Sequence, residues 1–171
     1  MSVELFISRT WRYASMLAFA LILLFTYRGL PDFTAVHFGP NGRGDGFLPK
    51  DEIFYLFLAI SLVVNILPIT VAKMIHKLPD TSFSWIPNKK WIASRKDLNA
   101  AISNWLNFLP AFINTFLILV LRAILTLNDD RSFNTSYSYL LVVGVILTLA
   151  WLFYLPIKLL YTNPTVVEVE D

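Results

Sequence analysis

Four long apolar runs, separated by polar segments, dominate the pattern of the chain. They cover Tyr13–Leu30, Ile53–Ile75, Leu106–Leu127 and Tyr139–Tyr161. Each run holds about 18 to 25 residues, and roughly 20 helical residues cross a hydrocarbon core of about 30 Å. The helices of a soluble bundle carry a polar face, yet stretches such as MLAFALILLF and YLLVVGVILTLAWLFYL are apolar on every side. The pattern therefore predicts one all-α integral membrane domain with four transmembrane helices.

The first run shares only some features with a cleaved secretory signal. Arg9 and Arg12 precede it, as in such a signal, but Tyr27-Arg28-Gly29 offers no site of small residues for cleavage. Its apolar core also exceeds the usual length of roughly 7–15 residues. We therefore expect this run to be a retained first span.

Lysine and arginine are distributed unequally between the two sides of the predicted spans. One side carries nine, namely Arg9, Arg12, Lys73, Lys77, Lys89, Lys90, Arg95, Lys96 and Lys158. The other side carries five, namely Arg28, Arg43, Lys50, Arg122 and Arg131. Because basic loops favour the cytoplasmic side, this bias predicts an N-in, C-in topology. Residues 31–52 then form an outer loop, and residues 76–105 form an inner loop.

The composition supports this class and excludes several chemistries. Hydrophobic residues make up 56% of the chain and charged residues 15%, which is greasier than a typical soluble domain. The absence of cysteine excludes disulfides, thiolate zinc sites and thiol catalysis. A net charge of +2 is too small to indicate nucleic-acid binding. We find no catalytic pair and no cofactor fingerprint in the sequence, so we expect neither an enzyme nor a cofactor.

Proline and asparagine interrupt the predicted spans. Pro68, Pro110 and Pro156 fall within the second, third and fourth runs, where a proline either kinks a packed helix or marks the broken helix of a transport site.

The intramembrane amides have a similar pair of interpretations. Asn65, Asn107 and Asn114 are the clearest polar residues in the runs, and the last two lie seven residues apart on one helix face. An amide that faces lipid is costly, so we expect these side chains to bond to another helix, with a ligand or ion site as the alternative.

The inner segment ends in a predicted amphipathic helix. Ser94 followed by Asp97 has the spacing of an N-cap with a capping box. Leu98, Ile102 and Trp105 then recur at helical spacing, which predicts a short helix that runs along the interface into the third span. Its basic residues would meet anionic headgroups or, alternatively, a regulator.

The outer segment concentrates candidate chemistry. GPNGRGDG lacks the Gly-Lys-Ser/Thr ending of a phosphate-binding loop and follows no predicted strand. Asp32, His37 and Asp45 offer a nitrogen and two carboxylates to a metal, but their spacing matches no standard motif, so we assign no metal. The other interpretation is a compact loop whose polar side chains bond its own backbone.

Two motifs resemble a known bacterial family. The outer segment contains Pro31, Asp32, His37, Phe38, Gly42, Asp45, Gly46 and Lys50. The inner segment contains Pro-Asn-x-x-Trp at Pro87, Asn88 and Trp91, followed by Arg95 where the family usually has an acidic-basic pair. Over residues 13–105 the chain resembles the membrane domain of unknown function 1648, which also occurs in toxin-immunity proteins of the SdpI type.

The resemblance implies a multi-pass protein of the bacterial cytoplasmic membrane. Immunity members protect the producing cell from a membrane-active peptide, and one also sequesters a cytoplasmic repressor. It therefore implies a non-enzymatic binding or sensing module whose outer loop recognises its ligand. The alternative is a structural accessory subunit of a larger membrane complex. The expected partners are the bilayer and a protein, whether a peptide, a regulator or a complex, and not nucleic acid.

Overall fold

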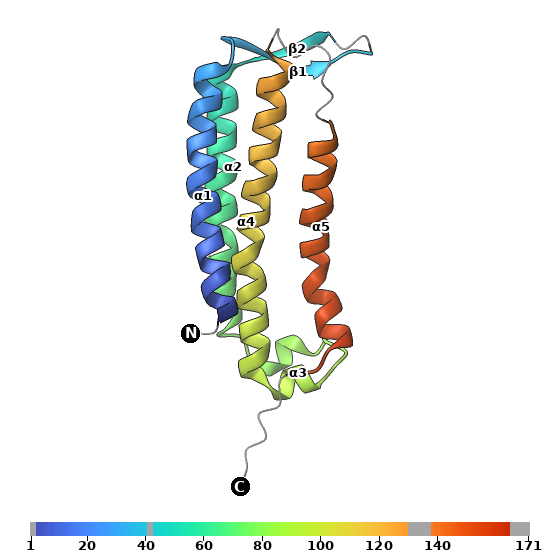
Figure 1. The fold of residues 1–171 in the computed structure, drawn as a ribbon. Coiled ribbons are helices and arrows are strands. Elements are labelled where there is room, and N and C mark those ends of the chain that lie inside the picture. The colour runs from blue at the N-terminus through green and yellow to red at the C-terminus, as the bar shows by residue number, and fades with distance from the viewer. Residues whose placement is uncertain (1–2, 41–42, 130–137, 165–171) are drawn as a thin grey trace.

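A computed structural model describes residues 3–40, 43–129 and 138–164 of the chain. The helices are α1 (Val3–Gly29), α2 (Lys50–Ile75), a 3-10 turn η1 (Asp80–Phe83), α3 (Lys90–Ala93), α4 (Arg95–Leu127) and α5 (Ser138–Tyr161). Two strands, β1 (Phe33–Phe38) and β2 (Gly44–Pro49), complete the fold (Figure 1). The predicted position of Gly42 lies outside the described residues.

Four of the helices are long and apolar enough to cross a membrane. They contain the candidate spans Phe6–Gly29, Lys50–Ile75, Arg95–Leu127 and Leu141–Tyr161, in agreement with the four predicted runs. Many large apolar side chains on their surfaces are more than half exposed. Leu17 is 62% exposed, Ile66 is 61% exposed and Ile146 is 58% exposed. Such surfaces suit lipid better than water.

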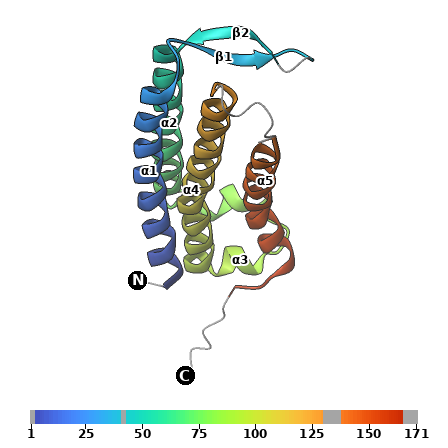
Figure 2. The ribbon, with the colours of Figure 1, turned by 45° about the horizontal axis from the view of Figure 1, so that its top comes forward.

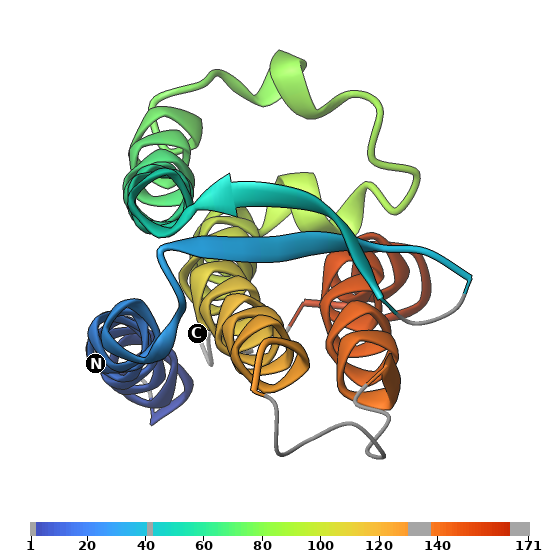
Figure 3. The ribbon, with the colours of Figure 1, turned by 90° about the horizontal axis from the view of Figure 1, so that it is seen from above.

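Helix α4 is the centre of the bundle, with α1, α2 and α5 packed around it (Figure 3). Two buried clusters hold the helices together. Towards the hairpin, the cluster joins α1, α2 and α4 through Phe19, Leu23, Leu30, Ile53, Phe57, Leu117 and Leu121. Towards the opposite end, it joins α2, α4, α5 and the α2–α4 connection through Ala72, Phe83, Ile86, Trp91, Leu98, Ile102, Leu106, Leu155 and Leu159.

The prediction of an all-α fold needs a correction at the outer segment. Strands β1 and β2 form an antiparallel hairpin that lies across the ends of the helices (Figure 2). The sequence of β1, FTAVHF, is rich in residues that favour strands, and Asn-Gly at positions 41–42 is a turn signal for hairpins. The register is irregular between Ala35 and Phe38, which breaks the strict alternation of inward and outward side chains.

The prediction of a separate, short interfacial helix is also wrong. Ser94 is the N-cap, as expected, but the helix that begins at Arg95 continues without a break to Leu127. Leu98 and Ile102 are buried because they are the first turns of α4, packed against the α2–α4 connection. The Ser94 hydroxyl donates to the Asp97 carboxylate at 2.7 Å instead of capping a backbone N–H.

Helix α1 begins ten residues before the predicted first span, at Val3. Arg9 and Arg12 therefore lie within it, and not in a polar segment that precedes the membrane. Three prolines, Pro68, Pro110 and Pro156, lie inside α2, α4 and α5, and all three helices continue past them. Pro68 and Pro110 are buried, which agrees with packed kinks.

A pair of tryptophans joins α5 to α4. The Trp105 indole N–H donates to the Trp151 carbonyl at 2.8 Å, and the Trp151 indole N–H donates to the Trp105 carbonyl at 3.1 Å. The two segments, WLNFLP and WLFYLP, are alike in sequence, and their tryptophans precede Pro110 and Pro156 by the same spacing. Because α4 and α5 run in opposite directions, equal segments meet as a symmetric pair (Figure 1).

Candidate functional site

The hairpin is fixed to the bundle by the side chain of Asn128, the C-cap residue of α4. Its amide oxygen accepts from the backbone N–H of Ala35 at 2.8 Å, and its amide nitrogen donates to the Ala35 carbonyl at 3.0 Å. The same nitrogen donates to the Ile124 carbonyl at 2.9 Å. The side chain thus pairs with β1 much as a neighbouring strand would. It also adds a second donor to the Ile124 carbonyl, which already accepts from the Asn128 backbone N–H at 3.2 Å.

An ion pair closes the base of the hairpin. The Lys50 ammonium lies 2.7 Å from the Asp32 carboxylate, and the Lys50 backbone N–H donates to the Asp32 carbonyl at 3.0 Å. The hydrogen bond from Lys50, together with its charge, lowers the pKa of the Asp32 carboxyl below its usual value. Pro31 precedes this pair, and the Thr34 hydroxyl donates to its carbonyl at 2.9 Å. Asp32 and Lys50 therefore define where the hairpin meets α2.

The three weak metal candidates are not brought together. His37 Nδ1 contacts the Asp45 carboxylate across the hairpin, whereas Asp32 is paired with Lys50. Within the part of the chain that the structure describes, no group of three metal-ligating side chains is found. The pairing of His37 with Gly46 in the register explains the glycine, because an added Cβ at Gly46 would lie 3.0 Å from the Cβ of His37.

The outward surface of the hairpin is aromatic. Apolar side chains cost free energy when they are left in water, yet only some of those in the hairpin pack on the bundle. Leu48 packs against the buried cluster near the hairpin, and Phe38 is half-buried. Phe33 is 70% exposed and Phe47 is 56% exposed, so more than half of each side chain is left uncovered by the bundle.

The Pro-Asn-x-x-Trp segment holds the end of α5. The Asn88 amide nitrogen and the Trp91 indole N–H both donate to the carbonyl of Thr162, each at 2.9 Å. Pro87 sets the turn just before them. The motif thus connects the α2–α4 connection to a residue more than 70 positions later, a structural contact that the sequence pattern alone does not identify.

Arg95 fixes the other side of the same connection. Its guanidinium donates to the carbonyl of Ile75 at 3.0 Å and to that of Leu78 at 2.9 Å, which are groups at the end of α2. It also lies 3.7 Å from the Asp80 carboxylate and 4.0 Å from the centre of the Phe83 ring. The two hydrogen bonds of Arg95 are those of a basic side chain at a helix C-terminus, while its Nη1 is buried and forms no hydrogen bond with the described residues.

The predicted hydrogen bonds to another helix are present for all three asparagines: for Asn107 to Arg12 of α1, and between Asn65 and Asn114. The side-chain amides of Asn65 and Asn114 form two reciprocal hydrogen bonds of 3.1 Å between α2 and α4. The Asn114 nitrogen also donates to the Ser15 hydroxyl of α1 at 3.3 Å, and Asn114 is fully buried. A single amide therefore joins three helices.

The partner of Asn107 is Arg12, a buried residue that sequence reasoning missed. The amide oxygen of Asn107 accepts from the Arg12 guanidinium at 2.7 Å, and Arg12 is only 8% exposed. Arg12 was treated as a flanking charge because the apolar run begins at Tyr13. The sequence did contain a signal, because Ser8, Arg12 and Ser15 recur at helical spacing and so share one polar face of the helix. In the structure all three residues are buried.

One contact invites a catalytic interpretation. His76 Nε2, at the C-cap of α2, lies 2.6 Å from the Ser103 hydroxyl in the first third of α4. A serine beside a histidine is the start of a nucleophile–base pair, but catalysis also needs oxyanion donors. The backbone N–H groups next to Ser103 belong to the hydrogen-bond ladder of α4. We interpret the contact as an interhelical hydrogen bond.

No protein-family model, curated protein or solved structure matches this chain in the comparisons made. The resemblance described above therefore rests on the motif residues alone, and the recognition role of the outer segment stays a prediction.

Proposed function

We propose that the protein is a non-enzymatic recognition module of the bacterial cytoplasmic membrane, of the toxin-immunity type. Its hairpin is the recognition surface, on the extracytoplasmic side. The ligand class is a membrane-active peptide, which shares the bilayer surface with the hairpin.

The observation that carries this proposal is the combination of fixed backbone and exposed aromatic side chains. Asn128 and the Asp32–Lys50 pair hold the hairpin at two points, while Phe33 and Phe47 remain exposed. A segment that served only as a cap would bury such side chains, because exposed apolar area costs free energy. Aromatic groups on a rigid backbone are typical of binding surfaces.

The charge distribution supports the proposed orientation. In Figure 1 the start of α1 and the α2–α4 connection lie at the end opposite to the hairpin. Basic residues concentrate at that opposite end, so it is the cytoplasmic one under the positive-inside rule. The hairpin then faces the medium from which a toxic peptide arrives.

The test is protection of sensitive cells. A bacterium that is killed by a panel of membrane-active peptides should survive at least one of them when it expresses this chain. Phe33→Ser with Phe47→Ser should abolish protection while the protein keeps its expression level and melting temperature. Phe6→Ser with Trp11→Ser, which changes exposed aromatic residues of α1 near the other end, is the matched control. Protection that survives the hairpin substitutions would refute the assignment of the surface.

The alternative function is that of an accessory subunit in a larger membrane complex, and α5 is the observation that favours it. This helix packs mainly against α4, and only 11% of its apolar window is buried inside the protein. A second membrane protein could cover the rest. Purification in mild detergent would then give a partner at fixed stoichiometry, and cells that lack the partner would degrade the chain.

A further inference from the structure

A polar cavity of about 1000 Å³ lies between α1, α2 and α4, at the end opposite to the hairpin. Basic side chains enter it from all three helices and from the residue that follows the α2 C-cap: Arg9, Arg12, Lys73, Lys77 and Lys96. None of the described residues that line it is acidic. So many like charges around one space repel each other unless an anion lies among them.

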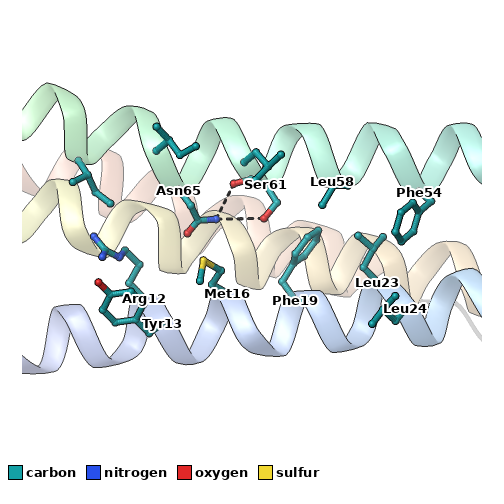
Figure 4. Close-up of a pocket in the computed structure, with 14 residues that line it drawn as sticks. Arg12, Tyr13, Met16, Phe19, Leu23, Leu24, Phe54, Leu58, Ser61 and Asn65 are labelled. Atoms are coloured by element: carbon teal, nitrogen blue, oxygen red, sulfur yellow. Dashed lines mark hydrogen bonds between the residues drawn. The ribbon is translucent and has the colours of Figure 1, made fainter.

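An apolar groove adjoins this cavity. It has a volume of about 470 Å³ and lies between α1 and α2, lined by side chains such as Met16, Ala20, Leu24, Leu58 and Leu62. Three residues, Arg12, Tyr13 and Ile69, line both spaces. Figure 4 shows Arg12 and Tyr13 at one end of the groove, with Leu24 and Phe54 at the other. A polar space therefore continues into an apolar one along the direction of the helices.

Arg12 stands at the junction of the two spaces. Its guanidinium donates to Asn107 and lies 4.6 Å from the centre of the Tyr13 ring. The described residues give it no carboxylate partner. A buried cation within a candidate span is expensive, and it normally faces a compensating anion.

A buried polar group without a hydrogen-bond partner lies in the same cavity. The amide oxygen of Asn99 is buried and accepts no hydrogen bond from the described residues. A buried acceptor without a donor destabilises the folded protein, so a ligand that brings a hydroxyl or an N–H would be stabilised there. The cavity thus offers several cations and one free acceptor.

We propose that the cavity and the groove together form a binding site for an anionic phospholipid. The phosphate of the headgroup lies among Arg12, Lys73 and Lys96, a headgroup hydroxyl donates to Asn99, and one acyl chain occupies the groove. Phosphatidylglycerol has all of these groups. The order of the two spaces fits a lipid within a bilayer, because the polar space lies at a helix end and the groove extends towards the middle of the spans.

The test measures lipid binding by the full-length chain in detergent, followed as a saturable rise in melting temperature. Phosphatidylglycerol should produce this rise, whereas phosphatidylcholine of the same acyl chains and inorganic phosphate should not. Equal effects of both lipids would overturn the role of charge. Saturation by phosphate alone to the same melting temperature would show a free anion site and would overturn the lipid assignment.

Paired substitutions locate the headgroup. Lys73→Gln with Lys96→Gln should raise the Kd for phosphatidylglycerol about 25-fold, at about fivefold for each lysine near an anionic group. Lys89→Gln with Lys90→Gln removes the same charge at the same end of the bundle, from residues that line neither space, and should leave the Kd unchanged. Equal losses in both pairs would mean that binding follows net charge alone, and the site would be refuted.

A second pair locates the acyl chain. Ala20 lines the groove and Ala18 does not, although both lie exposed on α1. Ala20→Phe fills part of the groove and should weaken binding of phosphatidylglycerol, whereas Ala18→Phe should not. Unchanged binding in a folded Ala20→Phe protein would remove the groove from the proposal. Lipid binding at this site does not depend on peptide recognition by the hairpin, so an experiment can refute one proposal and leave the other standing.

Discussion

The side-chain amide of Asn128 forms hydrogen bonds with both the N–H and the carbonyl of Ala35, a residue 93 positions earlier in the chain. Through this contact, the end of the central helix α4 becomes a neighbour of strand β1. The hairpin is therefore positioned by the helix that contacts α1, α2 and α5, and any displacement of α4 reaches the hairpin directly.

Replacement of Asn128 should release the hairpin without unfolding the bundle. Asn128→Ala leaves the buried polar groups of Ala35 without a partner, at a cost of about 1–3 kcal/mol. Amide hydrogen exchange in β1 and β2 should accelerate, while exchange in the middle of α4 stays unchanged. Asn128→Asp keeps an acceptor for the Ala35 N–H but places a carboxylate oxygen against the carbonyl oxygens of Ala35 and Ile124, so its effect should be at least as large as that of Asn128→Ala. Equal exchange rates in β1 and β2 of the natural protein and both variants would show that Asn128 does not hold the hairpin.

Acid should loosen the base of the hairpin. The pKa of Asp32 is lowered in the folded protein by its hydrogen bond with Lys50, so ionised Asp32 stabilises the folded state above its unfolded-state pKa of 3.8. That stabilisation is lost as the pH falls through the lower folded-state value. The effect is small, since the Asp32 side chain is 83% exposed and solvent screens the pair. Hydrogen exchange of the Lys50 amide can be followed from pH 6 to pH 2.5 and corrected for the intrinsic pH dependence of exchange. The protection of this amide should fall with pH in the natural protein and should not change with pH in Asp32→Asn.

The reciprocal amides of Asn65 and Asn114 should be coupled in stability. Each single substitution by leucine is expected to cost about 0.6–2 kcal/mol, because it leaves the other amide with fewer partners in an apolar surrounding. The double substitution should cost less stability than the sum of the two single substitutions, because both remove the same pair of hydrogen bonds. Thermal unfolding in detergent of the two single variants and the double variant measures this. Strict additivity would mean that the two amides act independently.

Trp91 should hold the end of α5 through its indole N–H. Trp91→Phe keeps most of the buried ring and removes the hydrogen bond to Thr162, at an expected cost of about 0.5–1.5 kcal/mol. Exchange should accelerate in the last turn of α5 and not in α1. Trp85→Phe is the matched control, because Trp85 is 69% exposed. A larger effect of the control than of Trp91→Phe would refute the assignment.

The orientation in the membrane can be tested with introduced cysteines, since the natural chain has none. Asn41→Cys and Asn134→Cys should react with an impermeant maleimide in intact cells, and Lys90→Cys should react only after lysis. The reverse pattern would move the hairpin to the cytoplasm, and the proposed recognition of an external peptide would fail with it.

The sequence by itself determined the four helices and the places where polar groups would need partners. Apolar runs of sufficient length are a local property, and they identify a span without knowledge of what surrounds it. The cost of an unpaired amide in an apolar surrounding is equally local, so Asn65 and Asn114 could be expected to bond across helices. The all-α prediction missed the hairpin, although its strand-forming residues and its Asn-Gly pair were local signals.

Tertiary structure decided which groups meet. Arg12 is separated from Asn107 by 95 positions, and Trp91 from Thr162 by 71, so no pattern within either segment identifies the partner. Likewise, four of the five basic residues of the polar cavity come from three helices and the fifth, Lys77, follows the C-cap of α2. Only the packing of α1 and α2 around α4 brings them to one space. Periodicity determines which face of each helix is polar, but relative rotation and depth of the helices determine what that face contacts.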